Sequence, residues 1–296
     1  MNNAQLGFFV VLAILMAVFQ IAWIRAARRT RESSIPRPRD LGVGVLTDFL
    51  DTLGIGSFAP TTALFKLFRM VPDELIPATL NIGHAWPAFA ESVIFVKSID
   101  VEPALLASVI GSAVAGAWLG AGVVRQLPRR AIQIAIGAAL LIAAIIFIAV
   151  SLGALPGGGT AMGLHGWRFG VAVGANFVFG ALMSVGIGLY APCMITLALL
   201  GLNPIGAFPI MMGACALVQL VAGIRFLARG QVAFGTAVGL ACGGLVGVAI
   251  AAFIVKSLPL DQLRWVVIFV VGYAAFAMLH SATQRPALQR AATPRA

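Results

Sequence analysis

The stretch GIGSFAP at residues 54–60 returns as GIGLYAP at residues 186–192, at an offset of 132 positions. Each copy interrupts a long apolar segment near its middle, and the two segments cover residues 41–69 and 173–201. The same offset matches further positions over about 70 residues without a gap: Gly42 with Gly174, Pro72 with Pro204, Pro77 with Pro209, Lys97 with Arg229, and Gly111 with Gly243. Because chance does not hold one register over such a length, the pattern indicates an internal duplication.

The composition of the chain places these breaks in a membrane. Of its 296 residues, 60% are hydrophobic and 10% are charged, whereas soluble domains carry about 25% charged residues. A soluble, disordered or secreted disulfide-rich protein is therefore excluded. The net charge of +10 does not indicate nucleic-acid binding, because the Lys and Arg residues cluster at the ends of apolar segments, as membrane orientation requires. The three cysteines, Cys193, Cys215 and Cys242, lack metal-ligand spacing and are interpreted as core residues.

Hydropathy predicts seven segments of the length that a helix needs to cross a bilayer, about 20 residues. They cover residues 6–24, 76–97, 102–124, 131–151, 206–228, 234–256 and 262–280. The first segment has no basic stretch before it, and six arginines follow it between Arg25 and Arg39. This order is typical of a retained anchor with its N-terminus outside, rather than of a cleaved signal peptide.

The two broken segments are predicted to be re-entrant hairpins. A continuous helix over residues 41–69 would be about 43 Å long, whereas the hydrocarbon core is about 30 Å thick. With two hairpins, 16 of the 20 Lys and Arg residues fall on the cytoplasmic side, against 13 if both segments cross. Each repeat then holds one hairpin and three full spans, so the copies face opposite sides of the membrane. Inverted repeats with broken helices are typical of secondary transporters.

We therefore expect an all-α polytopic protein of the cell (inner) membrane, with the N-terminus outside and the C-terminus in the cytoplasm. Seven full transmembrane helices and two Gly/Pro-broken hairpins form its two inverted repeats. The expected division is an anchor helix and basic cytoplasmic linker at 1–40, transporter repeat 1 at 41–151, an outer loop with the start of repeat 2 at 152–172, repeat 2 at 173–280, and a basic tail at 281–296.

The doubled Gly-Ile-Gly-x-x-x-Pro breaks resemble those of the TauE/SafE family. Each break is followed by a short arm, by a Pro-x4-Pro spacing (Pro72/Pro77 and Pro204/Pro209) and by apolar spans. The resemblance covers residues 41–280 and implies an exporter or permease for sulfite, organosulfonates or related sulfur compounds. The family's run of three glycines is replaced here by Gly56-Ser57-Phe58 and by Gly188-Leu189-Tyr190, which leaves the substrate open.

The breaks are the predicted site of an anionic substrate. Glycines let the backbone approach a ligand, and the free N–H groups at the start of a half-helix attract negative charge. The candidate substrate-binding residues are Gly54, Gly56, Ser57, Pro60, Thr61, Thr62, Gly186, Gly188, Tyr190 and Pro192. Two alternatives stay open: the glycines pack helices closely, and Tyr190 is an interface or packing residue.

Ionisable residues inside a membrane are expensive and therefore functional candidates. Those expected to couple transport to protons lie in the first repeat: Asp48, Asp51, Asn81, His84 and Glu91. Residues 81, 84 and 91 would form one polar stripe on the predicted span 76–97. The alternative is that Lys66 on the returning arm pairs with an aspartate, so that these groups only hold the hairpin. Lys97, six residues after Glu91, suggests that Glu91 lies near a membrane interface.

The sequence favours a secondary transporter of a small anion, driven by a proton or substrate gradient. Neither a Gly-x-Ser-x-Gly nor a His-Glu-x-x-His motif occurs, and no ATP-binding motif is present, so neither an enzyme nor a cofactor is expected. The alternatives are a divalent-cation transporter that uses the acidic residues and His84, and an anion channel. Partners are the lipid bilayer, the anion and protons, without nucleic acid. Small residues on the spans, such as Gly116 and Gly120, permit contact within the chain or in a homo-oligomer.

Overall fold

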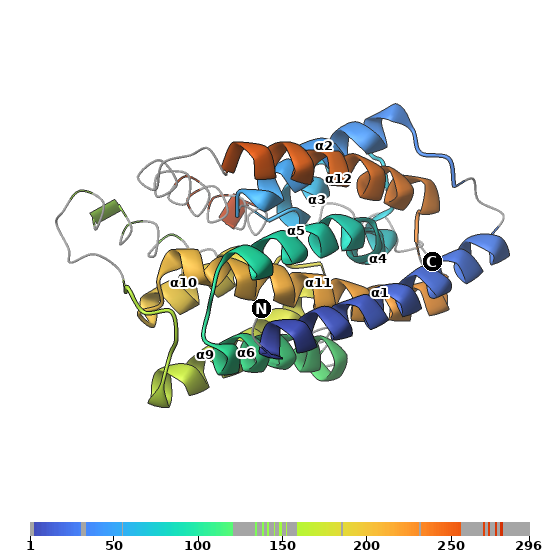
Figure 1. Ribbon diagram of the computed structural model, residues 1–296. Helices are drawn as coiled ribbons and strands as arrows, with labels where there is room; N and C mark the ends of the chain where they lie inside the picture. The colour runs from blue at the N-terminus through green and yellow to red at the C-terminus, as the bar shows by residue number, and fades with distance from the viewer. Residues whose placement is uncertain are drawn as a thin grey trace, which may run out of the picture.

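The computed structural model describes residues 3–30, 34–54, 56–120, 159–184, 186–230 and 232–255, with isolated positions between 134 and 152 and between 269 and 280. Within this part of the chain the protein is all-helical (Figure 1). The expected spans 131–151 and 262–280 fall almost wholly, and the tail 281–296 entirely, outside the described residues. The helices are α1 (Asn3–Arg29), α2 (Pro38–Thr52), α3 (Phe58–Leu67), α4 (Ile76–Gly83), α5 (Ala85–Ser98), α6 (Pro103–Ala115), α9 (Gly166–Met183), α10 (Tyr190–Leu199), α11 (Pro204–Arg229) and α12 (Phe234–Val255), with the short turns η1 (Asp73–Leu75) and η2 (Gly116–Gly120).

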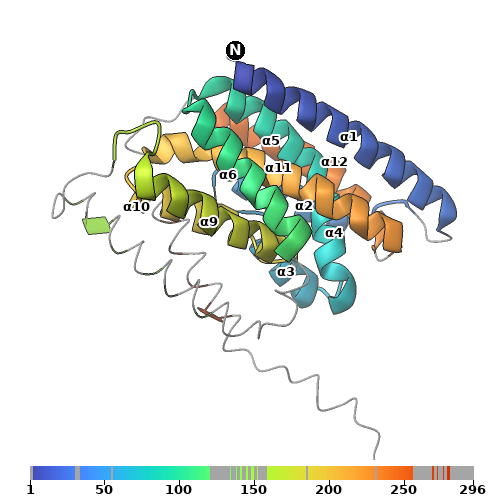
Figure 2. The ribbon, with the colours of Figure 1, turned by 90° about the horizontal axis from the view of Figure 1, so that it is seen from below.

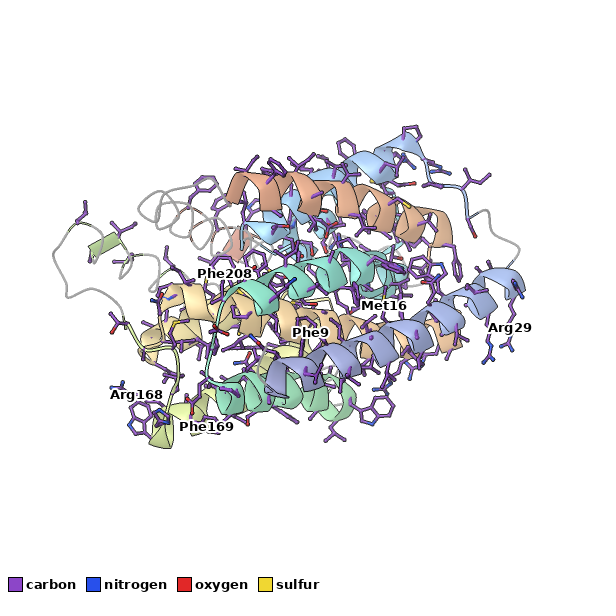
Figure 3. All side chains as sticks on the ribbon, viewed as in Figure 1. Phe9, Met16, Arg29, Arg168, Phe169 and Phe208 are labelled. Atoms are coloured by element: carbon purple, nitrogen blue, oxygen red, sulfur yellow. The ribbon has the colours of Figure 1, made fainter. Side chains whose placement is uncertain are left out.

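Among the described residues, four helices are long and apolar enough to cross a membrane. They are Gln5–Arg29, Gly166–Met183, Pro204–Arg229 and Phe234–Ile254, and the stretch Pro103–Leu119 is a shorter apolar helix. Leu6, Val10 and Ile14 on α1 are exposed, so that helix turns an apolar face outward, as a helix beside lipid does. Arg29 at the end of α1 and Arg168 near the start of α9 lie at opposite ends of the helical bundle (Figure 3).

Helix α11 forms the centre of the described bundle. It contacts α1, α4, α5, α6 and α10, which surround it in Figure 2. The Asn203 side chain accepts a hydrogen bond of 3.0 Å from the Ile205 N–H, and Pro204 occupies the first helical position, so both residues favour a helix start. The helix ends at Gly230, whose φ of 67° is left-handed, as is common after a helix C-terminus.

Glycines bring two pairs of helices into backbone contact. On α12, Gly243 faces the Leu41 carbonyl and Gly247 faces the Val45 carbonyl, so α12 lies directly against α2. On α6 and α9, Gly180 faces the Ala113 carbonyl. Small residues at such spacing let membrane helices pack closely. These glycines therefore have a packing role within the chain.

The helix expected over residues 76–97 is divided at His84 into α4 and α5. Pro87 explains the position of the break, because it has no N–H to donate to the carbonyl of Gly83. The helical hydrogen bonds otherwise continue, from His84 N to Leu80 O at 3.1 Å and from Ala88 N to His84 O at 2.9 Å. His84 therefore lies at a bend between two helices rather than on one straight stripe.

The two short helices after the breaks begin and end at positions 132 residues apart. Helix α3 covers Phe58–Leu67 and α10 covers Tyr190–Leu199. Gly54 and Gly186, which precede them, have φ values of 94° and 92°, a conformation that favours glycine. The arms before the breaks differ from the expectation. Helix α2 begins at residue 38 rather than 41, and α9 begins at residue 166 rather than 173, so α9 alone is long enough to span.

Candidate functional site

Eight polar side chains meet in the interior between the two breaks, and we name them the buried polar cluster. None is more than 3% exposed. They come from α2, the first break, α3, the bend between α4 and α5, α5 itself and α10: Asp48, Asp51, Thr52, Ser57, Thr61, His84, Glu91 and Tyr190. Burying ionisable groups is costly unless each is paired or hydrogen-bonded. Each ionisable group of the cluster therefore needs a hydrogen-bond or charge partner.

His84 joins two helices of the hairpin region. Its Nδ1 lies 2.8 Å from Asp48 Oδ1, and its Nε2 lies 3.1 Å from the Thr61 hydroxyl. A histidine between a carboxylate and a hydroxyl can hold a proton on either nitrogen and pass it between them. The bend caused by Pro87 gives the ring this position. The structure thus brings together three predicted residues, Asp48, Thr61 and His84.

Asp51 binds the start of the half-helix that follows its own break. Its Oδ1 accepts a hydrogen bond of 2.7 Å from the Ser57 N–H, and its Oδ2 accepts one of 3.0 Å from the Ser57 hydroxyl. Ser57 immediately precedes α3, where free N–H groups and the helix dipole favour an anion. A carboxylate of the protein itself, that of Asp51, therefore binds at this helix start.

Glu91 connects the two halves of the chain. Its Oε1 accepts a hydrogen bond of 2.6 Å from Thr52, and its Oε2 accepts one of 2.9 Å from the Tyr190 hydroxyl. Glu91 is fully buried, and Tyr190 is 3% exposed. Both side chains therefore face the interior of the protein rather than its surface.

Thr52 is a member of the cluster that the sequence analysis missed. Its hydroxyl contacts both the Asp48 carbonyl, at 2.9 Å, and Glu91. The available signal was a hydroxyl directly beside Asp51 and one helical turn after Asp48. Lys66, in contrast, is exposed and makes no ion pair with Asp48 or Asp51. The alternative in which Lys66 neutralises the aspartates is therefore wrong.

The two breaks lie against each other. A Cβ atom placed on Gly56 would lie 3.5 Å from Tyr190 Cβ, and one placed on Gly188 would lie 3.7 Å from Phe58 Cβ. Gly54 faces the Phe208 ring at 3.5 Å, while Gly186 faces Pro77 at 3.6 Å. A Cβ atom at these four positions would make ordinary van der Waals contacts, and it is the positive φ of Gly54, Gly56 and Gly186 that favours glycine there.

The remaining predicted residues lie around this centre. Pro60 and Pro192 occupy the third positions of α3 and α10, where a helix has no partner for the missing N–H. The matched prolines are therefore explained by helix starts. Thr62 is only partly buried, and no hydrogen bond joins it to the cluster. Asn81 donates to the Pro77 carbonyl at 2.8 Å and does not contact the other proton-coupling candidates.

Several buried polar atoms outside the cluster have no protein partner in the described part of the chain. They are Asn81 Oδ1, Asn176 Oδ1 and both amide atoms of Gln219. Such atoms are rare in folded proteins and indicate a bound water, ion or ligand. Asn81 and Gln219 lie on α4 and α11, which pack against each other.

No family model, curated protein or solved structure matches the chain. The resemblance to the TauE/SafE family rests on the doubled breaks and the proline spacing. Within the part of the chain that the structure describes, no group of three or more His, Cys, Asp and Glu side chains could hold a metal ion. The chemistry that the cluster offers is proton exchange between carboxylates, an imidazole and hydroxyls, next to a helix start that binds an anion.

Proposed function

We propose that the protein is a secondary transporter that moves a small anion across the cell membrane in exchange with, or together with, protons. The observation that favours it most is the pair of hydrogen bonds from Ser57 to the Asp51 carboxylate at the start of α3. A helix start inside a membrane protein that binds one anion is suited to bind another. The TauE/SafE resemblance specifies the class: sulfite, an organosulfonate or a related sulfur oxyanion.

In the proposed mechanism, Asp51 competes with the substrate. While its carboxylate is ionised, it occupies the Ser57 donors and repels an approaching anion. When it takes up a proton, the charge is lost and the donors become available to the substrate. The electrostatics of one carboxylate would thereby couple anion binding to protonation, because the ligand binds one protonation state better than the other.

The other ionisable groups provide places for further protons. The Asp48–His84 pair and Glu91 lie in the same cluster as Asp51. Their oxygens already have partners in the protein, namely His84, Thr52 and Tyr190. A divalent cation would have to displace these partners to gather its oxygen ligands. The arrangement therefore supports proton coupling better than cation binding.

Reciprocal contacts support the proposed inverted repeats. Gly56 meets Tyr190 and Gly188 meets Phe58, and the offset of 132 exchanges the members of these two pairs. The packing of α2 on α12 corresponds in the same way to that of α9 on α6. Such exchange is what a two-fold axis between the halves would produce. We propose seven full spans and two hairpins on this basis, the second hairpin having the longer first arm.

The decisive experiment measures uptake of labelled sulfite, sulfonates and sulfate into proteoliposomes, with and without an imposed pH gradient. In Asp51→Asn, the amide oxygen can still accept from Ser57, but the side chain no longer titrates. We expect saturable substrate binding to persist and its dependence on pH to disappear. Asp100→Asn is the matched control, because Asp100 is an exposed aspartate outside the cluster.

Two results would contradict the proposal. An unchanged pH dependence in Asp51→Asn would remove Asp51 from the mechanism. Absence of anion flux in the wild type, with movement of divalent cations instead, would replace the anion transporter by a cation transporter. Flux that does not saturate with substrate would favour a channel.

A further inference from the structure

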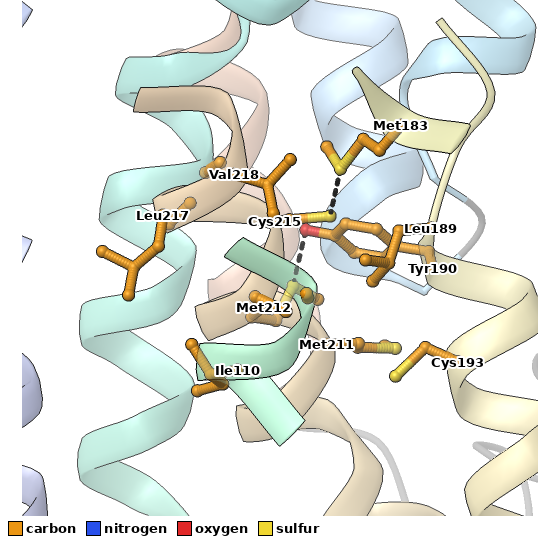
Figure 4. Close-up of a cluster of buried hydrophobic side chains, with 14 of the residues drawn as sticks. Ile110, Met183, Leu189, Tyr190, Cys193, Met211, Met212, Cys215, Leu217 and Val218 are labelled. Atoms are coloured by element: carbon orange, nitrogen blue, oxygen red, sulfur yellow. Dashed lines mark hydrogen bonds between the residues drawn. The ribbon is translucent and has the colours of Figure 1, made fainter. Parts of the chain in front are cut away.

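Three sulfur-containing side chains surround the Tyr190 hydroxyl on the side of the second break. Cys215 Sγ lies 3.6 Å from Met183 Sδ, and the Tyr190 hydroxyl oxygen lies 2.9 Å from Met212 Sδ (Figure 4). Met183 is 1% exposed, and Met212 and Cys215 are fully buried. We name these three residues the sulfur cluster. Further buried sulfur atoms line the same region on α10 and α11: Cys193, Met194 and Met211.

We propose that the sulfur cluster is a binding site for a soft monovalent metal ion, of the copper(I) or silver(I) type. Thiol and thioether sulfur are the ligands that such ions prefer over carboxylates and water. With metal–sulfur bonds of about 2.3 Å, a separation of 3.6 Å corresponds to a sulfur–metal–sulfur angle of roughly 100°. Cys215 and Met183 could therefore hold one ion without a large movement of either helix.

The spacing along α11 places a third and a fourth donor on the same side. Met212, Cys215 and Gln219 are separated by three and four residues, so they share one face of the helix. Met212 would provide a second thioether. Gln219 is fully buried and neither of its amide atoms has a partner. An unpaired, buried amide on the same face of α11 is a second, independent indication of a ligand on that face.

The sulfur cluster exists in only one half of the chain. At the offset of 132, the register positions of Met183, Met212 and Cys215 hold Asp51, Leu80 and Gly83 in the first half. The halves thus present a carboxylate in one copy and a thioether in the other, at the same position before each break.

The charges of the site are compatible with binding in the interior. When the ion binds, a sulfur–metal bond replaces the S–H bond of Cys215, and the thiol proton is released to the aqueous solvent. One monovalent cation and one thiolate have no net charge together, so burial costs far less than for an isolated ion. No change in oxidation state is needed.

The test is the binding of silver(I), the air-stable probe, to the purified full-length protein in detergent. All variants include Cys242→Ser, because Cys242 is an exposed cysteine that would bind silver on its own. We expect one tightly bound ion per chain. Mutating a residue that only orients a metal ligand typically lowers metal affinity by about 10- to 100-fold, and losing a direct ligand should lower it at least as much. We therefore expect Cys215→Ser to weaken silver binding by more than about 100-fold and Met183→Leu by about 10-fold or more.

The controls separate a metal site from a sulfur-rich core. Met16→Leu makes the same change in a buried methionine of α1, far along the chain from the cluster, and should leave silver affinity unchanged. X-ray absorption of the copper(I)-loaded protein should show sulfur neighbours at about 2.3 Å. The proposal is overturned if no silver binds, if Cys215→Ser and Met183→Leu bind like the wild type, or if the bound copper has only nitrogen or oxygen neighbours. Anion flux is not involved, so the result is independent of the transport proposal.

Discussion

At the scale of single residues, the hydroxyl of Thr52 stabilises the buried carboxylate of Glu91. Glu91 is buried without a cation, and its two oxygens depend on the hydroxyls of Thr52 and Tyr190. Removing one donor leaves a carboxylate oxygen in an apolar interior, which costs more than the hydrogen bond itself.

Thr52→Val removes that donor with almost no change in shape. We expect a loss of about 1–3 kcal/mol in the free energy of unfolding, since a buried group is left unsatisfied, together with a large loss of transport. Thr47→Val is the control on the same helix, because the buried Thr47 hydroxyl bonds only the Val43 carbonyl. Thermal unfolding and proteoliposome flux measure both effects. Equal unfolding temperatures and equal fluxes of the two variants would show that the Thr52–Glu91 hydrogen bond contributes to neither stability nor transport.

At the scale of helices, the site depends on how closely α12 lies against α2. Gly244 on α12 faces the Asp48 carboxylate and the Pro87 ring, so that a Cβ atom there would overlap both. Its neighbours Gly243 and Gly247 also face α2, at the Leu41 and Val45 carbonyls. The sequence did not identify Gly244 as part of the site, because only the fold brings α12 against α2.

Gly244→Ala should therefore push Asp48 away from His84 and lower transport more than it lowers stability. Gly42→Ala is the control, since a Cβ atom at Gly42 meets nothing within 4 Å and alanine favours a helix. We expect the control to transport like the wild type and to unfold at the same or a higher temperature. The proposed role of Gly244 fails if both alanine variants transport normally.

Much of the site was predictable at this scale. The breaks, the matched helix starts and the burial of Asp48, Asp51 and His84 follow from apolar length and from the cost of charge in a membrane. Their partners did not follow, because hydrogen bonds such as Tyr190 to Glu91 join residues 99 positions apart. Local pattern also gave no reason to expect Asp51 to bind its own helix start, which depends on the turn at Gly54.

At the scale of the whole molecule, the two possible topologies differ in the side of the membrane on which each broken segment ends. Hairpins and full crossings place the residues after α3 on opposite sides of the membrane relative to the linker between α1 and α2. Ser34, which precedes the first broken segment, and Lys66, near the end of its second arm, are both exposed.

Cysteines at these two positions test the topology directly. In a background with the three native cysteines replaced by alanine, Ser34→Cys and Lys66→Cys should react with a membrane-impermeant thiol reagent from the same side. Arg168→Cys, at the other end of the bundle (Figure 3), should react from the opposite side. Labelling of residues 34 and 66 from opposite sides would show that the first segment crosses, and the inverted arrangement would have to be abandoned.

The reciprocal contacts between the breaks affect which amino-acid substitutions this protein can accept during evolution. An assembly of two identical chains around a two-fold axis must repeat every substitution on both sides. Here the equivalent positions belong to one chain, so residue 51 is an aspartate while residue 183 is a methionine. In the proposed inverted repeats, covalent linkage of the two halves would let similar backbones hold different side-chain chemistry. Phe58 and Tyr190 each contact the opposite break. Substitutions at these two positions are therefore constrained by the same packing geometry.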